Sequence, residues 1–182
     1  MNLAYFDCFS GISGDMTLGA LLDAGCDLAR LRADLQSLQV PGWEISAEKV
    51  WKNGMAATYA KVKTEDQKKH RSLTDILEIL KNSTLDEHVR DRATLIFQKL
   101  GEAESRVHDV PLDKIHFHEV GAVDAIIDIV GSCIGFHQLS IDKFACSPLN
   151  VGGGTAKMAH GVLPVPAPAT AALLNEIGRA HV

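Results

Sequence analysis

The segment KIHFHEVGAVDAIIDIVG (residues 114–131) combines a long apolar run with an unusual set of polar side chains. It contains two histidines and three carboxylates, and apart from Lys114 its other residues are apolar or glycine. Charged side chains are rarely buried without a partner or a metal ion. We therefore expect this segment to contribute to a functional site as well as to the core.

The apolar run over residues 120–139 predicts a buried helix, because it is too long for a typical strand. Asp124 and Asp128 are four residues apart and would share one face of that helix. His116 and His118 are two apart and would point the same way in an extended segment. Imidazoles beside carboxylates favour a divalent-metal site. The alternative is that the aspartates accept hydrogen bonds from a helix N-terminus or from basic side chains, while the histidines serve as caps.

A second candidate site lies near the start of the chain. Residues 3–8 predict a buried strand, FSGISGD (residues 9–15) predicts a turn, and the apolar residues over 16–22 have helical spacing. A helix start that follows a glycine turn presents free N–H groups and suits a phosphate. The candidate phosphate-binding residues here are Ser10, Ser13 and Gly14.

Two aspartates flank the same turn and complicate the phosphate hypothesis. Asp7 and Asp15 would repel a phosphate unless a cation lay between them. This makes Asp7 a candidate for a metal-linked, catalytic role. The alternative is that Asp7 hydrogen-bonds the turn and Asp15 caps the helix.

A third candidate is the glycine-rich segment VGGGTAK (residues 151–157), which follows a predicted strand over 141–147. Gly153 and Gly154 would let the backbone approach a ligand closely, and Lys157 could bind a phosphate or carboxylate. No complete nucleotide-binding motif is present.

The remaining pattern predicts an α+β fold in a single domain, residues 1–182. Asn53-Gly54 between two β-like runs predicts a β-hairpin, and Ser72 with Asp75 resembles a capping box. Apolar spacing over residues 28–38 and 85–107 predicts two further helices. We expect a small mixed sheet of strands near 3–8, 43–51, 54–62 and 141–147, covered by helices, with a helical block over 72–139 between the hairpin and the last strand.

Composition narrows the class of protein. The 182 residues are 46% hydrophobic and 23% charged, which is typical of a globular domain. A net charge of -5 gives no support to a nucleic-acid surface, and no apolar run has the length of a membrane span. Four scattered cysteines without a C-x-x-C pair or a signal peptide favour a reduced, cytoplasmic protein.

Four ordered segments resemble one family. They are FDCFSGISGDM (6–16), HRSLTDI (70–76), IHFHEVGAVD (115–124) and AHGVLPVPAPAT (159–170). Together they are similar to the LarC family of nickel-insertion proteins in nickel-pincer cofactor biosynthesis. The resemblance implies a lyase-class nickel chelatase that inserts nickel into pyridinium-3,5-bisthiocarboxylic acid mononucleotide, in a CTP-dependent reaction, to make the cofactor of lactate racemase.

Matching that chemistry to the motifs gives an expected site. The predicted nickel ligands are His116, His118, Glu119, His70 and His160. Asp7, Asp124 and Asp128 are expected to act as ligands, outer-sphere groups or proton acceptors. The substrate phosphate is expected at Ser10, Ser13, Gly14, Gly153, Gly154 and Lys157.

The sequence departs from the family pattern in two places. Many members carry a histidine-rich tract where this chain reads EDQKKH (65–70), so nickel storage is expected to be reduced here. Members also continue into a C-terminal part, to which CTP handling with a divalent cation is assigned, so this chain resembles the N-terminal portion alone.

The expected partners are the mononucleotide substrate, the C-terminal part and apo lactate racemase as recipient, and a homo-oligomer is compatible with the sequence. Two other functions stay open: a metallochaperone that holds nickel without chemistry, and a metal-dependent phosphohydrolase using Asp7, Asp15 and the glycine-rich turns.

Overall fold

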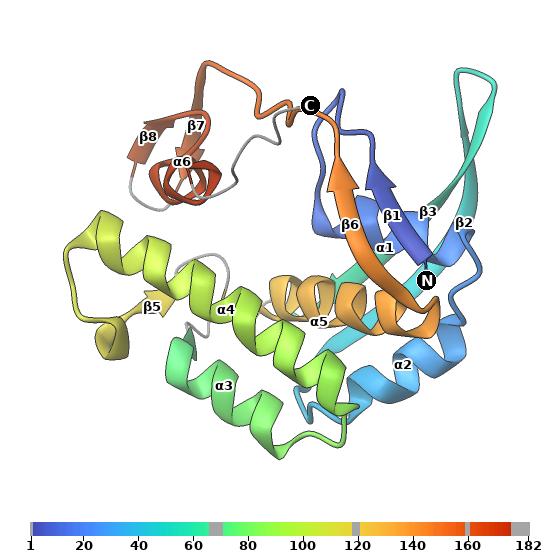
Figure 1. Cartoon of the computed structure of the whole chain (residues 1–182), viewed down its shortest axis with the longest axis horizontal. Coiled ribbons are helices and arrows are strands. Elements are labelled where there is room, and N and C mark those ends of the chain that lie inside the picture. Colours follow the sequence, from blue (N-terminus) through green and yellow to red (C-terminus); the bar gives the residue numbers. More distant parts are fainter. Residues whose placement is uncertain (1, 66–70, 118–120, 159–160, 176–182) are drawn as a thin grey trace.

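A computed structural model describes residues 2–65, 71–117, 121–158 and 161–175. Its centre is helix α5 (Val123–Gln138), which contacts α1 (Gly14–Asp23), α2 (Leu28–Gln36) and α4 (Glu87–His108) (Figure 1). The predicted buried helix is therefore confirmed, three residues shorter at its start. Its most buried side chains include Ile126, Ile127, Val130 and Ile134.

Glycines on α5 allow α1 to approach closely. A Cβ atom added at Gly131 would lie 3.0 Å from Leu18 Cδ2, and one at Gly135 would lie 2.8 Å from Leu21 Cδ1. Both leucines are buried in the core. The small residues in the apolar run thus serve helix packing.

The α+β class and the hairpin are confirmed, but the strands do not form one sheet. β1 (Asn2–Phe6) pairs in parallel with β6 (Ile141–Cys146), while β2 (Trp43–Lys52) pairs only with β3 (Met55–Thr64) among the described residues. Asn53 and Gly54 both have positive φ, as a tight hairpin turn requires.

The hairpin is separated from β1 because it packs on α1 instead. Gly19 of α1 is buried directly against the backbone carbonyl of Thr58 in β3. A residue without a side chain lets this strand lie on the helix. The hairpin therefore covers α1, and its far end projects from the molecule (Figure 1).

The predicted helical block lies between the end of β3 and the start of β6 in the sequence. α3 (Leu73–Asn82) begins with the predicted Ser72–Asp75 capping box and packs on α4. The short 3₁₀ turn η1 (Leu112–Lys114) leads into β5 (His116–Phe117), which pairs with β4 (Arg71–Ser72).

The last described part forms a small unit on α4. β7 (Thr155–Met158) and β8 (Gly161–Pro164) make a hairpin, and α6 (Pro168–Leu174) contacts α4 (Figure 1). None of the helices in the described ranges is both long and apolar enough to cross a membrane.

Candidate functional site

The turn predicted to bind phosphate lies at the carboxyl edge of the β1–β6 pair. Because the two strands are parallel, both chains leave at the same edge, where ligands bind in many open α/β sheets. The backbone N–H of Cys8 donates to Ser147 Oγ at 2.7 Å, and the N–H of Ser147 donates to the Phe6 carbonyl at 2.9 Å. The segments after the two strands are therefore tied together.

Asn150 fixes the shape of the turn. Its side-chain amide donates to the Phe9 carbonyl at 2.8 Å, and its backbone N–H donates to the Cys8 carbonyl at 3.3 Å. Gly11 has a φ of 87°, and an added Cβ would lie 3.2 Å from the Asn150 carbonyl oxygen. The turn is thus held by a loop that lies about 140 residues away in the sequence.

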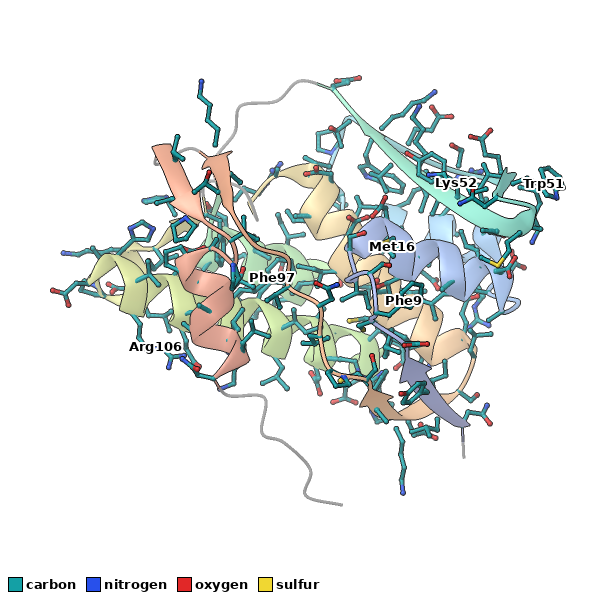
Figure 2. All side chains as sticks on the ribbon, turned by 90° about the horizontal axis from the view of Figure 1, so that it is seen from above. Phe9, Met16, Trp51, Lys52, Phe97 and Arg106 are labelled. Atoms are coloured by element: carbon teal, nitrogen blue, oxygen red, sulfur yellow. The ribbon has the colours of Figure 1, made fainter. Side chains whose placement is uncertain are left out.

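The predicted residues of this turn are placed as follows. Asp7 and Ser10 are exposed, and Gly14 is the first residue of α1. Ser13 holds the N-cap position, but its hydroxyl donates to the Asp15 carboxylate and not to a backbone N–H. The alternative that Asp15 caps the helix is wrong, because Ser13 is the N-cap residue and Asp15 lies inside the first turn. Phe9 and Met16 lie exposed on either side of the helix start (Figure 2).

Asp128 is strongly affected by its surroundings. Its Oδ2 lies 2.5 Å from where a Gly14 Cβ would be, so only glycine fits there without a shift. Its Oδ1 is buried and has no hydrogen-bond partner among the described residues. Burial, then the charges of Asp15 and Asp124, raises the pKa of the Asp128 carboxyl to about 6.

The two aspartates of α5 therefore differ. Asp124 is exposed, and its Oδ1 accepts from the N–H of Ala125 at 2.9 Å. Asp128 has a carboxyl that can both hold and release a proton near neutral pH. Unpartnered buried polar atoms are uncommon and often mark functional sites.

A buried arginine, Arg71, contacts the backbone near His116. In the β4–β5 pair Arg71 lies opposite Phe117, and Ser72 lies opposite His116. The Arg71 side chain is only 5% exposed, and its guanidinium donates to the Gly121 carbonyl at 3.1 Å. Arg71 thereby fixes the backbone on either side of the HEV segment (118–120), and His116 itself is exposed.

Several predicted ligands cannot be placed. His70, His118, Glu119 and His160 lie outside the described residues. Within residues 2–65, 71–117, 121–158 and 161–175, no three His, Cys, Asp or Glu side chains are grouped closely enough to hold a metal ion.

The glycine-rich segment (151–157) is linked to the turn before α1 through Asn150. Gly152 donates its N–H to Asn150 Oδ1 at 3.1 Å, but Gly154 bonds instead through its carbonyl to Val165. Gly153 and Lys157 are exposed, and Lys157 pairs with Val162 in the β7–β8 hairpin. In the described part of the chain no hydrogen bond links Gly153, Gly154 or Lys157 to residues 7–15.

A cavity of about 470 Å³ opens beside Asp128. The side chains that line it come from β1, the turn before α1, α1, α4, α5 and β6, and they include Phe6, Arg92, Phe136 and Phe144. None of these four residues was predicted from the sequence to belong to a site. No local signal marks them, because they converge only when the four elements that carry them, β1, α4, α5 and β6, pack together.

Comparison with known proteins decides the family. The family model described as nickel insertion protein matches residues 4–181. The chain belongs to the nickel insertion protein family. The relatives include the pyridinium-3,5-bisthiocarboxylic acid mononucleotide nickel insertion protein of Desulfitobacterium hafniense, which is 50% identical over 177 residues, or 97% of this chain and 44% of the relative.

Two further relatives are similar to this chain to about the same extent. The putative nickel insertion protein of Dictyoglomus thermophilum is 45% identical, and the alignment covers 97% of this chain and 46% of that relative. The putative nickel insertion protein of Wolinella succinogenes is 49% identical, and the alignment covers 96% of this chain and 45% of that relative. The chain thus spans a little under half the length of these relatives. No solved structure matches it.

Proposed function

We propose that this chain supplies the nickel- and substrate-handling part of an enzyme that inserts nickel into pyridinium-3,5-bisthiocarboxylic acid mononucleotide. The observation that carries the proposal is the family match over residues 4–181, together with the 50% identical relative that is named for this substrate. The activity belongs to the lyase class as a nickel chelatase.

The proposed reaction needs a proton acceptor. Nickel(II) becomes bonded to two sulfurs and one ring carbon, so one ring C–H bond breaks, one nickel–carbon bond forms, and one proton leaves without any change in oxidation state. Asp128 is suited to take this proton, because its raised pKa of about 6 lies close to neutral pH. Asp7 and Asp124 are exposed and serve in the proposal as nickel ligands or as further proton acceptors.

Nickel is the cargo in this proposal, and imidazoles suit it. The proposed ligands are His116, His118, Glu119, His70 and His160. Support comes from the β4–β5 pair, in which Arg71 and Ser72 of one motif lie opposite Phe117 and His116 of the other. Two family motifs that lie more than forty residues apart are thereby brought together.

The remaining parts of the proposal concern the phosphate and the partners. The substrate phosphate is assigned to Ser10, Ser13 and Gly14 at the start of α1 and to the more distant Gly153, Gly154 and Lys157. CTP and its divalent cation are assigned to a C-terminal part like that of the longer relatives, apo lactate racemase is the proposed recipient, and the reaction is placed in the cytoplasm.

The direct test mixes the purified chain with the C-terminal part of the Desulfitobacterium relative, nickel, CTP and the thiolated mononucleotide. Mass spectrometry should detect the nickel-bearing product, and apo lactate racemase should gain activity. Failure of both readouts with both parts present would refute the nickel chelatase. Nickel binding without product would identify a metallochaperone, and phosphate release would identify a phosphohydrolase.

A second test concerns the nickel ligands. We expect the double variant His116→Ala/His118→Ala to bind nickel at least tenfold more weakly by calorimetry, because two imidazole ligands are lost. His88→Ala is the matched control, since His88 is an exposed histidine on α4. Equal affinity of the double variant and the wild type would place nickel elsewhere.

A further inference from the structure

The cavity beside Asp128 has the dimensions and lining of a small-molecule site. Its volume of about 470 Å³ lies within the range of known ligand pockets. At its border lie Ile12, in the turn that leads into α1, and Gly14, the first residue of α1. A ligand in the cavity would therefore reach the segment proposed to bind phosphate.

Three phenylalanine rings form one wall. Phe136 of α5 meets Phe144 edge to face at 5.0 Å and Phe6 at 6.0 Å, measured between ring centroids. Phe6 and Phe144 are inclined by only 19° to each other, with centroids 6.5 Å apart. Such nearly parallel rings on neighbouring strands present faces on which a planar ring can stack.

The neutral polar groups of the cavity are already engaged. The Thr17 hydroxyl donates to the Ser13 carbonyl at 2.9 Å, and the Ser132 hydroxyl donates to the Asp128 carbonyl at 2.6 Å. Burial raises the pKa of the Cys133 thiol to about 12, so this thiol stays protonated and is a poor metal ligand.

The charged groups Asp128 and Arg92 remain available. Asp128 has one buried oxygen without a partner among the described residues. The Arg92 guanidinium lies 5.1 Å from the centre of the Phe144 ring and forms no ion pair within the described part of the chain. The cavity therefore offers one anion, one cation and an aromatic wall.

We propose that this cavity binds the pyridinium ring of the mononucleotide, stacked on the phenylalanine wall, with Asp128 facing the cationic ring and Arg92 facing an anionic ring substituent. This inference rests on the proposed function, and it adds Phe6, Phe136, Phe144 and Arg92 as substrate-binding residues. A pyridinium carboxylate carries all three features that the cavity complements: a flat aromatic surface, a positive ring and a negative substituent.

The experiment measures binding of nicotinic acid mononucleotide, a pyridinium carboxylate mononucleotide, to the purified chain by calorimetry. Phe144→Ala and Arg92→Gln should each weaken binding at least tenfold. Tyr5→Ala and Arg90→Gln are the matched controls and should change affinity by less than twofold. Tyr5 lies on the opposite face of the β1–β6 pair from Phe144, and Arg90 lies outside the cavity on the same helix as Arg92.

Unchanged affinity in both cavity variants would overturn the inference, and so would equal losses in the cavity variants and the controls. In case a variant fails to fold, nuclear Overhauser contacts between the pyridinium protons and phenylalanine rings of the wild-type chain provide a second test, and their absence counts against the cavity. Absence of binding would also overturn the inference. Product formation in the nickel assay described above would then still support the proposed function.

Discussion

The two sides of α5 differ in what they contribute. On one side Ile126, Ile127, Val130 and Ile134 are at most 1% exposed and belong to the core. On the other side Asp128 keeps a buried oxygen that accepts no hydrogen bond from any residue the structure describes, next to an open cavity. A buried carboxylate without a partner costs stability. Its presence on the same helix as a well-packed core is the pattern expected where a residue is kept for a function and not for folding.

The core side should show the largest effect on stability. Ile127→Ala removes a fully buried side chain and should lower the free energy of unfolding by about 2–5 kcal/mol, from lost burial and the cavity left behind. Urea denaturation measures the change. The exposed Met16→Ala should alter it by less than about 0.5 kcal/mol. A similar loss in both variants would remove the contrast between core and surface.

The contact between α1 and Asp128 should come next. Gly14→Ala places a methyl group against the Asp128 side chain and should destabilise the chain by about 1–3 kcal/mol, because tightly packed sites tolerate added atoms poorly. Gly153→Ala is the control, since an added Cβ there has no neighbour within 4 Å. If Gly14→Ala proved neutral in denaturation experiments, Asp128 would have room to move away from α1.

The charge on the Asp128 carboxylate should lower the stability of the folded chain, so removing it should stabilise the chain. The pKa of Asp128 is about 6 in the folded chain and about 4 when unfolded. The folded state therefore binds the proton more tightly than the unfolded state does. The stabilisation from this proton is fully present below about pH 4 and is lost as the pH rises through about 6. At pH 7.5 the charge should cost on the order of 1–2 kcal/mol, allowing for partial exposure.

Asp128→Asn should therefore raise the free energy of unfolding at pH 7.5 and flatten the dependence of that free energy on pH between about 4 and 6. Denaturation across this pH range measures the effect. The exposed Asp124→Asn should leave the pH dependence largely in place. Lower stability of Asp128→Asn at pH 7.5 would mean that Asp128 is structural.

The smallest effect concerns two thiols near the cavity. Cys133 is 1% exposed, with a thiol pKa of about 12, whereas Cys146 is exposed at the end of β6. At pH 8, iodoacetamide should label Cys146 in the folded chain and Cys133 only after unfolding, as followed by mass spectrometry. Equal labelling rates in the folded chain would show that the α5 side of the cavity opens readily.

The secondary structure of the central elements could be predicted because their signals are local. The long apolar run specified α5, Asn53-Gly54 specified the β2–β3 turn, and Ser72 with Asp75 specified the start of α3. The division of the strands could not be predicted in this way. It depends on Gly19 meeting the backbone of β3, a contact between segments about forty residues apart.

In the candidate site, too, some features follow from local sequence and others depend on tertiary packing. The family motifs, the helix that carries Asp124 and Asp128, and the grouping of imidazoles and carboxylates in one segment can all be read from the order of the residues. The packing of the elements in three dimensions leaves Asp124 exposed, sets Asp128 half-buried against Gly14 with a buried Oδ1, and brings Arg92 and three phenylalanines together beside it. The physical reason is that burial, pKa and cavity shape depend on what other elements place around a residue, and here those elements are α1, α4, β1 and β6.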